Sequence, residues 1–161
     1  AAVKQPGLVY MRGLRGMVPR LLDPGKYVFE IGKTCRLREG GGPGIIATGA
    51  GTEWAIEASR LLDRAGIDHA LLHVPTLKPV RHEEIWRFCE GRDRLFSIEN
   101  HNIIGDLGGL VAEIMADHGG GPKLTRLGVP DHWAPGGSLA YIRKSLGLDA
   151  ENLARQIKEA A

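Results

Sequence analysis

The stretch "IIATGAGTEWAIEASRLL" at residues 45–62 decides the fold class of this chain. An apolar run stops at Gly49 and Gly51, and the residues after them change to helical spacing. Thr52 is placed to cap the expected helix, and Gly66 is placed to end it. A strand, a glycine turn and a helix in this order begin a βα unit, and many nucleotide-binding domains begin in the same way.

The residues around this turn argue against a dinucleotide site. The fingerprint Gly-x-Gly-x-x-Gly requires a third glycine, but that position holds Trp54. Glu53 would repel a pyrophosphate, and the next expected strand ends near His73 instead of an acidic residue for the ribose. We therefore interpret Gly49 and Gly51 as turn residues.

Strands and helices alternate outward from this unit. Residues 34–38 alternate between polar and apolar side chains, which is typical of an edge strand with one face in solvent. Only a turn separates them from residues 45–49, so antiparallel pairing with that strand is expected. Other strands are expected at 7–12, 69–74, 94–99 and 123–129, and other helices at 81–91, 105–119, 139–147 and after Asp149, with Ser138 as a cap. From residue 34 this order predicts a three-layer α/β/α sandwich with a mostly parallel sheet and one antiparallel edge strand.

Length and composition disfavour several classes of protein. The 161 residues, of which 43% are hydrophobic, fit one compact domain with a short piece of another. A net charge of +2 with interspersed signs is not typical of a nucleic-acid binder, and no apolar stretch is long enough to cross a bilayer. Cys35 and Cys89 lie far apart, which suits a reducing compartment, so a cytoplasmic protein is expected. The six histidines form no HExxH pattern, and no metal site is expected.

The segment "SIENHNIIGDLGG" at residues 97–109 carries the densest chemistry. Glu99 and His101 alternate on an expected strand, so they could share one face as an acid/base pair. Gly105 precedes a helix start, where free N–H groups attract anions. In the alternative interpretation, the two side chains only cap and orient the loop. That alternative is favoured because no third catalytic partner is evident.

A second candidate site follows the expected strand at 7–12. Arg12 and Arg15 are three residues apart in "YMRGLRG", with glycines that would let a ligand approach. The forked guanidinium of arginine suits phosphate groups. A solvated basic turn explains the same spacing, and the spacing alone leaves both interpretations open.

Six segments in register resemble the C-terminal part of transketolase, in particular the C-terminal subunit of two-chain transketolases. They are "GLVYMRGLRGMVP", "FEIGKTCRLREGG", "IIATGAGTEWAIEASRLLDRAGI", "LLHVPTLKPV", "SIENHNIIGDLGGLVAEIMA" and "LTRLGVPDHWAPGGSLAYIRKSLGLDAENLARQI". The resemblance implies that residues 1–20 end a preceding pyrimidine-binding domain. It further implies a linker at 21–33 and a transketolase C-terminal domain at 34–161. The family fold is an α/β/α sandwich whose mixed sheet has one antiparallel strand.

The resemblance also implies a function for a longer enzyme. That enzyme transfers a two-carbon ketol group from a ketose phosphate to an aldose phosphate, using thiamine diphosphate with Mg²⁺ or Ca²⁺. The family's Gly-Asp-Gly motif and cofactor-activating glutamate are not in this sequence, so this chain is expected to be structural and inactive alone. Its expected partners are the missing thiamine-binding domains or subunit and a second copy of itself. The family's substrate-phosphate arginine matches Arg15, with Arg12 as an earlier neighbour.

Two departures and two alternatives accompany this resemblance. Asp106 replaces a glycine in "GDLGG", and "WAPGG" differs from the usual sequence of the last crossover loop. The first alternative is a related thiamine enzyme, either a 2-oxo acid dehydrogenase β subunit or deoxyxylulose-phosphate synthase. The second alternative is a free-standing α/β binding module with its own pocket near Gly49, His73 and His101. Residues 7–31 are expected to expose an apolar face if the preceding domain is missing, and so to drive self-association.

Overall fold

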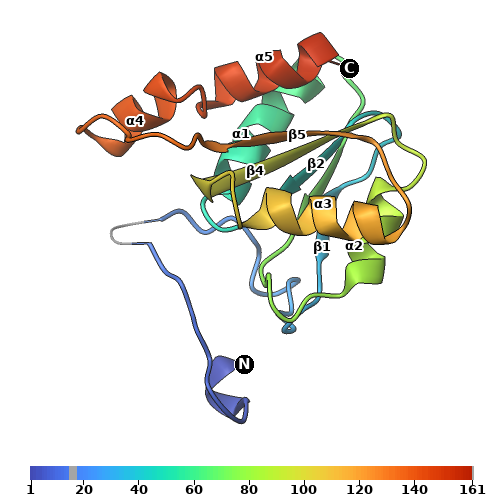
Figure 1. The fold of residues 1–161 in the computed structure, drawn as a ribbon. Coiled ribbons are helices and arrows are strands. Elements are labelled where there is room, and N and C mark those ends of the chain that lie inside the picture. The colour runs from blue at the N-terminus through green and yellow to red at the C-terminus, as the bar shows by residue number, and fades with distance from the viewer. Residues whose placement is uncertain (15–17, 161) are drawn as a thin grey trace.

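The structure is a computed structural model that describes residues 1–14 and 18–160. At its centre is a five-stranded sheet with the strand order β1-β3-β2-β4-β5 (Figure 1). The strands are β1 (Cys35–Arg38), β2 (Gly44–Ala47), β3 (Ala70–His73), β4 (Arg94–Asn102) and β5 (Lys123–Val129). The helices are α1 (Gly51–Arg64), α2 (His82–Cys89), α3 (Leu107–Asp117), α4 (Leu139–Ser145) and α5 (Ala150–Ala160), and a 3-10 turn, η1, covers Ala2–Lys4. The predicted order of elements from residue 34 is confirmed.

The sheet is mixed, as predicted, with β1 as its antiparallel edge strand. Strand β2 is parallel to β3 and β4, and β4 is parallel to β5. The predicted partner of β1 is wrong, because β1 pairs with β3 and not with β2. Both edges of β2 are occupied by its parallel neighbours, so β1 pairs instead with the edge of β3 that β2 leaves free.

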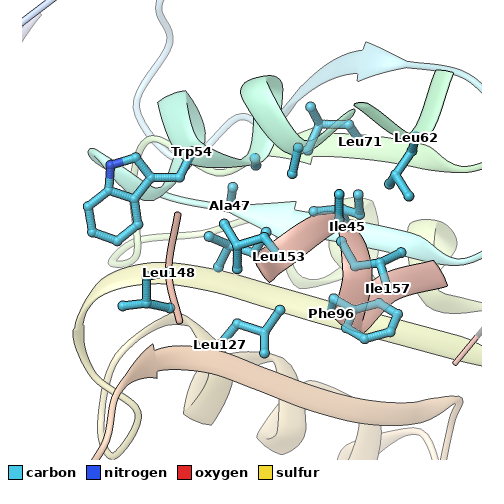
Figure 2. Close-up of a cluster of buried hydrophobic side chains, with 14 residues drawn as sticks. Ile45, Ala47, Trp54, Leu62, Leu71, Phe96, Leu127, Leu148, Leu153 and Ile157 are labelled. Atoms are coloured by element: carbon cyan, nitrogen blue, oxygen red, sulfur yellow. The ribbon is translucent and has the colours of Figure 1, made fainter. Parts of the chain in front are cut away.

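Alternating side chains of the central strands build one core on each face of the sheet. Ile45 and Ala47 point toward α1 and α5, together with Trp54 of α1 (Figure 2). Ile46 points to the opposite face, where α2 and α3 contribute Phe88 and further apolar side chains. This arrangement agrees with the predicted three layers, since β2 is buried along its whole length.

The predicted caps are partly confirmed. The Ser138 hydroxyl accepts a hydrogen bond from the backbone N–H of Tyr141, and Asp149 accepts one from the N–H of Asn152. The Thr52 cap is wrong, because α1 begins one residue before Thr52. The Thr52 hydroxyl lies 2.8 Å from Nδ1 of His73 instead.

The chain before β1 has little regular structure in its described part. Apart from the 3-10 turn, residues 5–14 and 18–34 form no helix or strand, and the strand predicted at 7–12 is wrong. A strand requires a neighbouring strand to bond its backbone groups, and residues 7–11 run away from the sheet (Figure 1). Across residues 1–14 and 18–160, no helix combines the length and apolar character that crossing a membrane would require.

Candidate functional site

The carboxyl end of β4 places Glu99 and His101 in different environments. The Glu99 side chain is completely buried, whereas 46% of the His101 side chain is exposed. Their spacing of two predicts a shared face, but the pairing of β4 with β5 becomes irregular between Ile98 and Asn102. No hydrogen bond or ion pair joins Glu99 to His101 in the described part of the chain. The geometry therefore favours the structural interpretation over an acid/base pair.

Glu99 lies under the first turn of α3 with half of its carboxyl group unpartnered. Its Oε1 accepts a hydrogen bond from the backbone N–H of Gly108 at 3.2 Å. Its Oε2 and the nearby Ser97 hydroxyl have no hydrogen-bond partner among the described residues. Two glycines make room for these groups: a Cβ at Gly128 would lie 2.9 Å from Glu99 Cγ, and one at Gly108 would lie 2.7 Å from Ser97 Oγ.

Burial raises the pKa of Glu99 to about 7. The negative charge of Asp106 raises this pKa further. Hydrogen bonds from the backbone of Gly108 and Leu107 act in the opposite direction, as does the charge of Arg126. Near neutral pH, Glu99 is therefore close to the midpoint of its titration.

We expect Glu99 to make the folded state less stable as the pH rises. In the unfolded chain a glutamate has a pKa of about 4.3, so between that value and about 7 the folded chain binds more protons. The contribution of Glu99 to the free energy of unfolding is complete below this window and is lost through it. Glu99→Gln stays neutral, so its stability relative to wild type should improve by on the order of 3 kcal/mol between pH 4.5 and 8.

Urea unfolding of both proteins at the two pH values measures this difference. Glu113→Gln is the matched control, because Glu113 is an exposed glutamate of α3, the helix that covers Glu99. Its stability difference from wild type should be the same at both pH values. An equally constant difference for Glu99→Gln would contradict the prediction.

The N-terminal segment contacts this end of the sheet through Arg12. One guanidinium nitrogen, Nη2, donates to the backbone carbonyl of Asn100 at 3.1 Å. The other, Nη1, lies 3.8 Å from the carboxylate of Asp106, which also lies 3.6 Å from Nδ1 of His101. Arg12 is thus already held by a carbonyl and a carboxylate, and a role in binding phosphate stays a prediction. Arg15 lies outside the described residues.

The start of α3, where an anion site was predicted around Gly105, carries acidic side chains. Gly105 has a positive φ of 82° and lies on the surface, with open space where a side chain would project. The carboxylate of Asp106, which stands at the N-cap, and that of Glu99 both lie at this helix end. Two carboxyl groups in this position would repel an incoming anion. The anion role that was predicted around Gly105 therefore gains no support.

The pocket predicted for a free-standing binding module, near Gly49, His73 and His101, is largely filled by neighbouring side chains. The ring of His73 contacts the Thr52 hydroxyl, and burial lowers the pKa of His73. A Cβ at Gly49 would lie 3.2 Å from the side-chain oxygen of Asn100. Two surface hollows lie elsewhere: one of about 450 Å³ among α1, α4 and α5, and one of about 610 Å³ at the start of α2.

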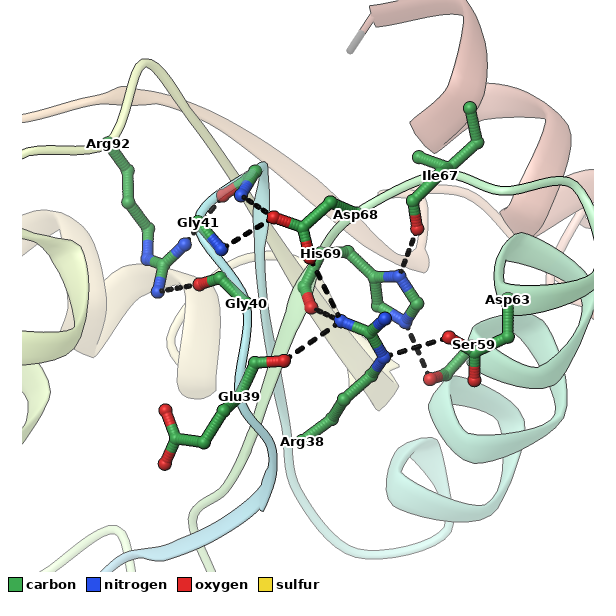
Figure 3. Close-up of polar contacts among 11 residues, drawn as sticks. Arg38, Glu39, Gly40, Gly41, Ser59, Asp63, Ile67, Asp68, His69 and Arg92 are labelled. Carbon is green, nitrogen blue, oxygen red and sulfur yellow. Dashed lines mark hydrogen bonds and ion pairs between the residues drawn. The ribbon is translucent and has the colours of Figure 1, made fainter.

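A denser polar network lies at the opposite, amino end of the strands, and the sequence did not predict it (Figure 3). Arg38 donates to Asp63 at 2.9 Å and to the backbone carbonyl of His69. The carboxylate of Asp68 accepts from the N–H groups of Gly41 and Gly42, and the hydrogen bond from Gly41 is the largest cause that lowers its pKa.

This network closes the turn between β1 and β2. Arg92 donates to the carbonyls of Gly40, Gly42 and Phe88. A Cβ at Gly40 or Gly42 would lie 2.1 Å from a backbone oxygen, so the chains approach too closely for any side chain. Because these charges are paired or bound to carbonyls, the network has a structural role. In the sequence, the glycine run "GGGPG" after Arg38 was the feature from which this close packing could have been predicted.

Comparison with known proteins gives a consistent result. The family model described as "Transketolase, C-terminal domain" matches residues 32–153. The chain is 39% identical to the uncharacterized transketolase family protein y4mN of Sinorhizobium fredii over 99% of this chain and 47% of that protein. It is 32% identical to 1-deoxy-D-xylulose-5-phosphate synthase of Heliobacterium modesticaldum over 99% of this chain and 25% of that enzyme.

A solved structure supports the same relation. The structure described as "Split gene transketolase, inactive beta4 tetramer" superimposes with a TM-score of 0.78 at 29% identity. The superposition covers 89% of this chain and 46% of that one. The chain thus spans about half, or less, of the length of the relatives that it matches.

Proposed function

Because this chain belongs to the transketolase C-terminal domain family, we propose that it is the C-terminal section of a thiamine diphosphate-dependent transketolase. The whole enzyme would transfer a two-carbon ketol group from a ketose phosphate to an aldose phosphate. The chain itself would be inactive alone, and its role would be to pack against the thiamine-binding domains or subunit and against a second copy of itself.

The exposed apolar N-terminal segment is the observation that carries this proposal. Leu8 is completely exposed and Tyr10 is 88% exposed, and Met11, Val28 and Phe29 also lie open to solvent. Residues 1–11 extend away from the sheet (Figure 1), and none of the described residues before Gly32 is buried. Contiguous exposed apolar side chains mark an interaction surface, which supports packing against another domain.

The described residues of this chain do not fit the cofactor. A metal-bound diphosphate requires oxygen ligands for the cation and donors for the phosphates. Among residues 1–14 and 18–160, no group of three or more His, Cys, Asp or Glu side chains could hold a metal ion. At the start of α3, the carboxyl groups of Glu99 and Asp106 would repel the diphosphate. We therefore propose that the partner domains or subunit bind thiamine diphosphate and Mg²⁺ or Ca²⁺.

The relatives support a partner subunit and self-assembly. The superimposed structure is described as a split gene transketolase and as an inactive tetramer. By analogy, we propose that this section works together with a second polypeptide or domain that binds the cofactor. The chain on its own would assemble without activity.

We expect the 161-residue chain to self-associate through its N-terminal segment. The triple variant Leu8→Ser, Tyr10→Ser, Met11→Ser removes exposed apolar side chains, so it should shift the protein toward monomer in multi-angle light scattering. Leu139→Ser is the control, because Leu139 is an exposed apolar residue of α4 outside the segment. A wild-type chain that stays monomeric at high concentration would refute this prediction.

The proposed function is tested first on the coding DNA. The reading frame in front of Ala1 should continue into a pyrimidine-binding domain that carries the cofactor-activating glutamate. The complete protein, supplied with a diphosphate-binding domain or subunit and thiamine diphosphate, should then transfer ketol groups from a ketose phosphate. Ketol transfer by the 161-residue chain alone would overturn the structural role.

A second candidate function is supported by one of the relatives. The 32% identity to a 1-deoxy-D-xylulose-5-phosphate synthase extends over 99% of this chain. That candidate predicts pyruvate as the donor in place of a ketose phosphate. The same assay, run with each donor in turn, separates the two enzymes.

A further inference from the structure

The hollow among α1, α4 and α5 is lined by three arginines. It has a volume of about 450 Å³, which lies in the range of small-molecule sites. Arg60 and Arg64 line it from α1, and Arg143 lines it from α4. Figure 1 shows α5 beside α1, and the residues that line the hollow do not include Arg12, Glu99 or Asp106. The hollow is therefore separate from the contacts of Arg12 and Glu99.

Two of these arginines have no acidic partner in the described part of the chain. Arg60 and Arg64 are four residues apart on α1, so their side chains lie on one face and repel each other. Both are exposed, and neither takes part in a hydrogen bond or ion pair that joins described residues. Two like charges that share a hollow favour an anion between them.

The third arginine is fixed in position and keeps free donors. Nη2 of Arg143 donates to Glu57 at 2.8 Å, and its guanidinium carbon lies 4.9 Å from the centre of the Trp54 ring. Glu57 is thus paired with Arg143, while Nη1 of Arg143 has no hydrogen-bond partner among the residues described. The side chain is therefore held in place before any ligand arrives.

Three carboxylates, those of Glu57, Asp149 and Glu151, also line the hollow, so its formal charge is balanced and the positions of the charges matter. Glu57 forms an ion pair with Arg143. Asp149 accepts hydrogen bonds from the backbone N–H and the side chain of Asn152 in the first turn of α5. Burial raises the pKa of Asp149, but these hydrogen bonds outweigh it and lower the pKa. Glu151 is the remaining acid of the lining. Positive charge is thus concentrated on the α1 wall at Arg60 and Arg64, which form no ion pair with a described residue, while Asp149 and Glu151 lie at the start of α5.

We propose that this hollow binds a small phosphate-bearing anion, held by Arg60 and Arg64 from α1 and by Arg143 from α4. Guanidinium groups bind phosphate oxygens through paired charge-assisted hydrogen bonds, which suits three arginines on two walls. The ligand would bridge two helices of one face of the domain and so would stabilise the docking of α4 on α1. This site goes beyond the proposed transketolase role and does not depend on it.

Calorimetric titration of the 161-residue chain with pyrophosphate at low salt tests the site. Binding should saturate at one equivalent, and Arg60→Gln/Arg64→Gln should weaken it by about tenfold for each arginine removed. The control is Arg20→Gln/Arg87→Gln, which removes the same charge from exposed residues outside this hollow. The control should bind as tightly as wild type.

Two outcomes would overturn the proposal. No saturable binding by the wild-type chain is one, and equal weakening by the control pair is the other, since it would reveal non-specific attraction. Far-ultraviolet circular dichroism of each variant checks that the fold is kept. Because α1 is exposed at Arg60 and Arg64, both substitutions should leave the fold intact.

Discussion

Replacement of Phe88 by alanine is expected to lower the free energy of unfolding by about 3–5 kcal/mol. The ring is completely buried and joins α2 to the sheet within the second core. The guanidinium carbons of Arg36 and Arg92 lie 4.4 and 4.8 Å from its centre, so the variant loses two cation–π contacts as well as apolar burial. Since small domains are stable by about 5–15 kcal/mol, this single change removes a large part of the total.

Two further variants make the Phe88 prediction specific. Phe88→Leu keeps most of the apolar volume and should cost less than about 1.5 kcal/mol. Trp133→Ala removes a larger aromatic ring, but Trp133 is 99% exposed, and the change should stay within about 0.5 kcal/mol. Urea unfolding monitored by circular dichroism measures all three. If Phe88→Ala and Trp133→Ala had similar effects, α2 would not be docked as the structure places it.

Gly51→Ala is expected to destabilise the fold by on the order of 3 kcal/mol, although alanine is the better helix former. A Cβ at Gly51 would lie 2.5 Å from the backbone oxygen of Ile98 and 2.9 Å from Cα of Glu99. Both atoms belong to the backbone of β4, which is held between β2 and β5 and cannot move aside. The first turn of α1 would have to shift away from the sheet, which would open the core around Trp54.

Gly109→Ala is the matched control for this prediction. Gly109 is also a helix residue with an ordinary backbone conformation, but a Cβ there meets no atom within 4 Å. Alanine at this position should stabilise α3 by about 0.5–1 kcal/mol. Opposite signs for the two glycine-to-alanine changes are expected in thermal and urea unfolding. A neutral Gly51→Ala would show that α1 does not approach β4 as closely as the structure has it.

The sequence predicted the regular part of the fold well because that part depends on local pattern. Strand β2 forms at the apolar run, and α1 forms over the helical spacing after Gly51. Gly66, predicted to end this helix, has a positive φ just beyond its last turn. The same holds for α2, whose predicted inward residues Ile85, Phe88 and Cys89 are all buried. The prediction at 7–12 failed, since strand-like composition does not supply a neighbouring strand.

The candidate site was predicted less well. The spacing of Glu99 and His101 was correct for a strand, but an irregularity in β4 and the cover of α3 bury one side chain and expose the other. The contact of Arg12 with Asn100 joins residues 88 positions apart, and no local pattern can reveal it.

By itself, the sequence determined the order of the strands and helices and the family, because apolar periodicity and turn residues act over a few neighbours. The tertiary structure alone decided which strand β1 joins, because that depends on which edge of the sheet is free. It also decided that Glu99 is buried with an unpartnered oxygen and that Arg60, Arg64 and Arg143 share one hollow. Such features arise when separate elements pack together, and the burial and charge of a side chain then depend on neighbours that are distant in sequence.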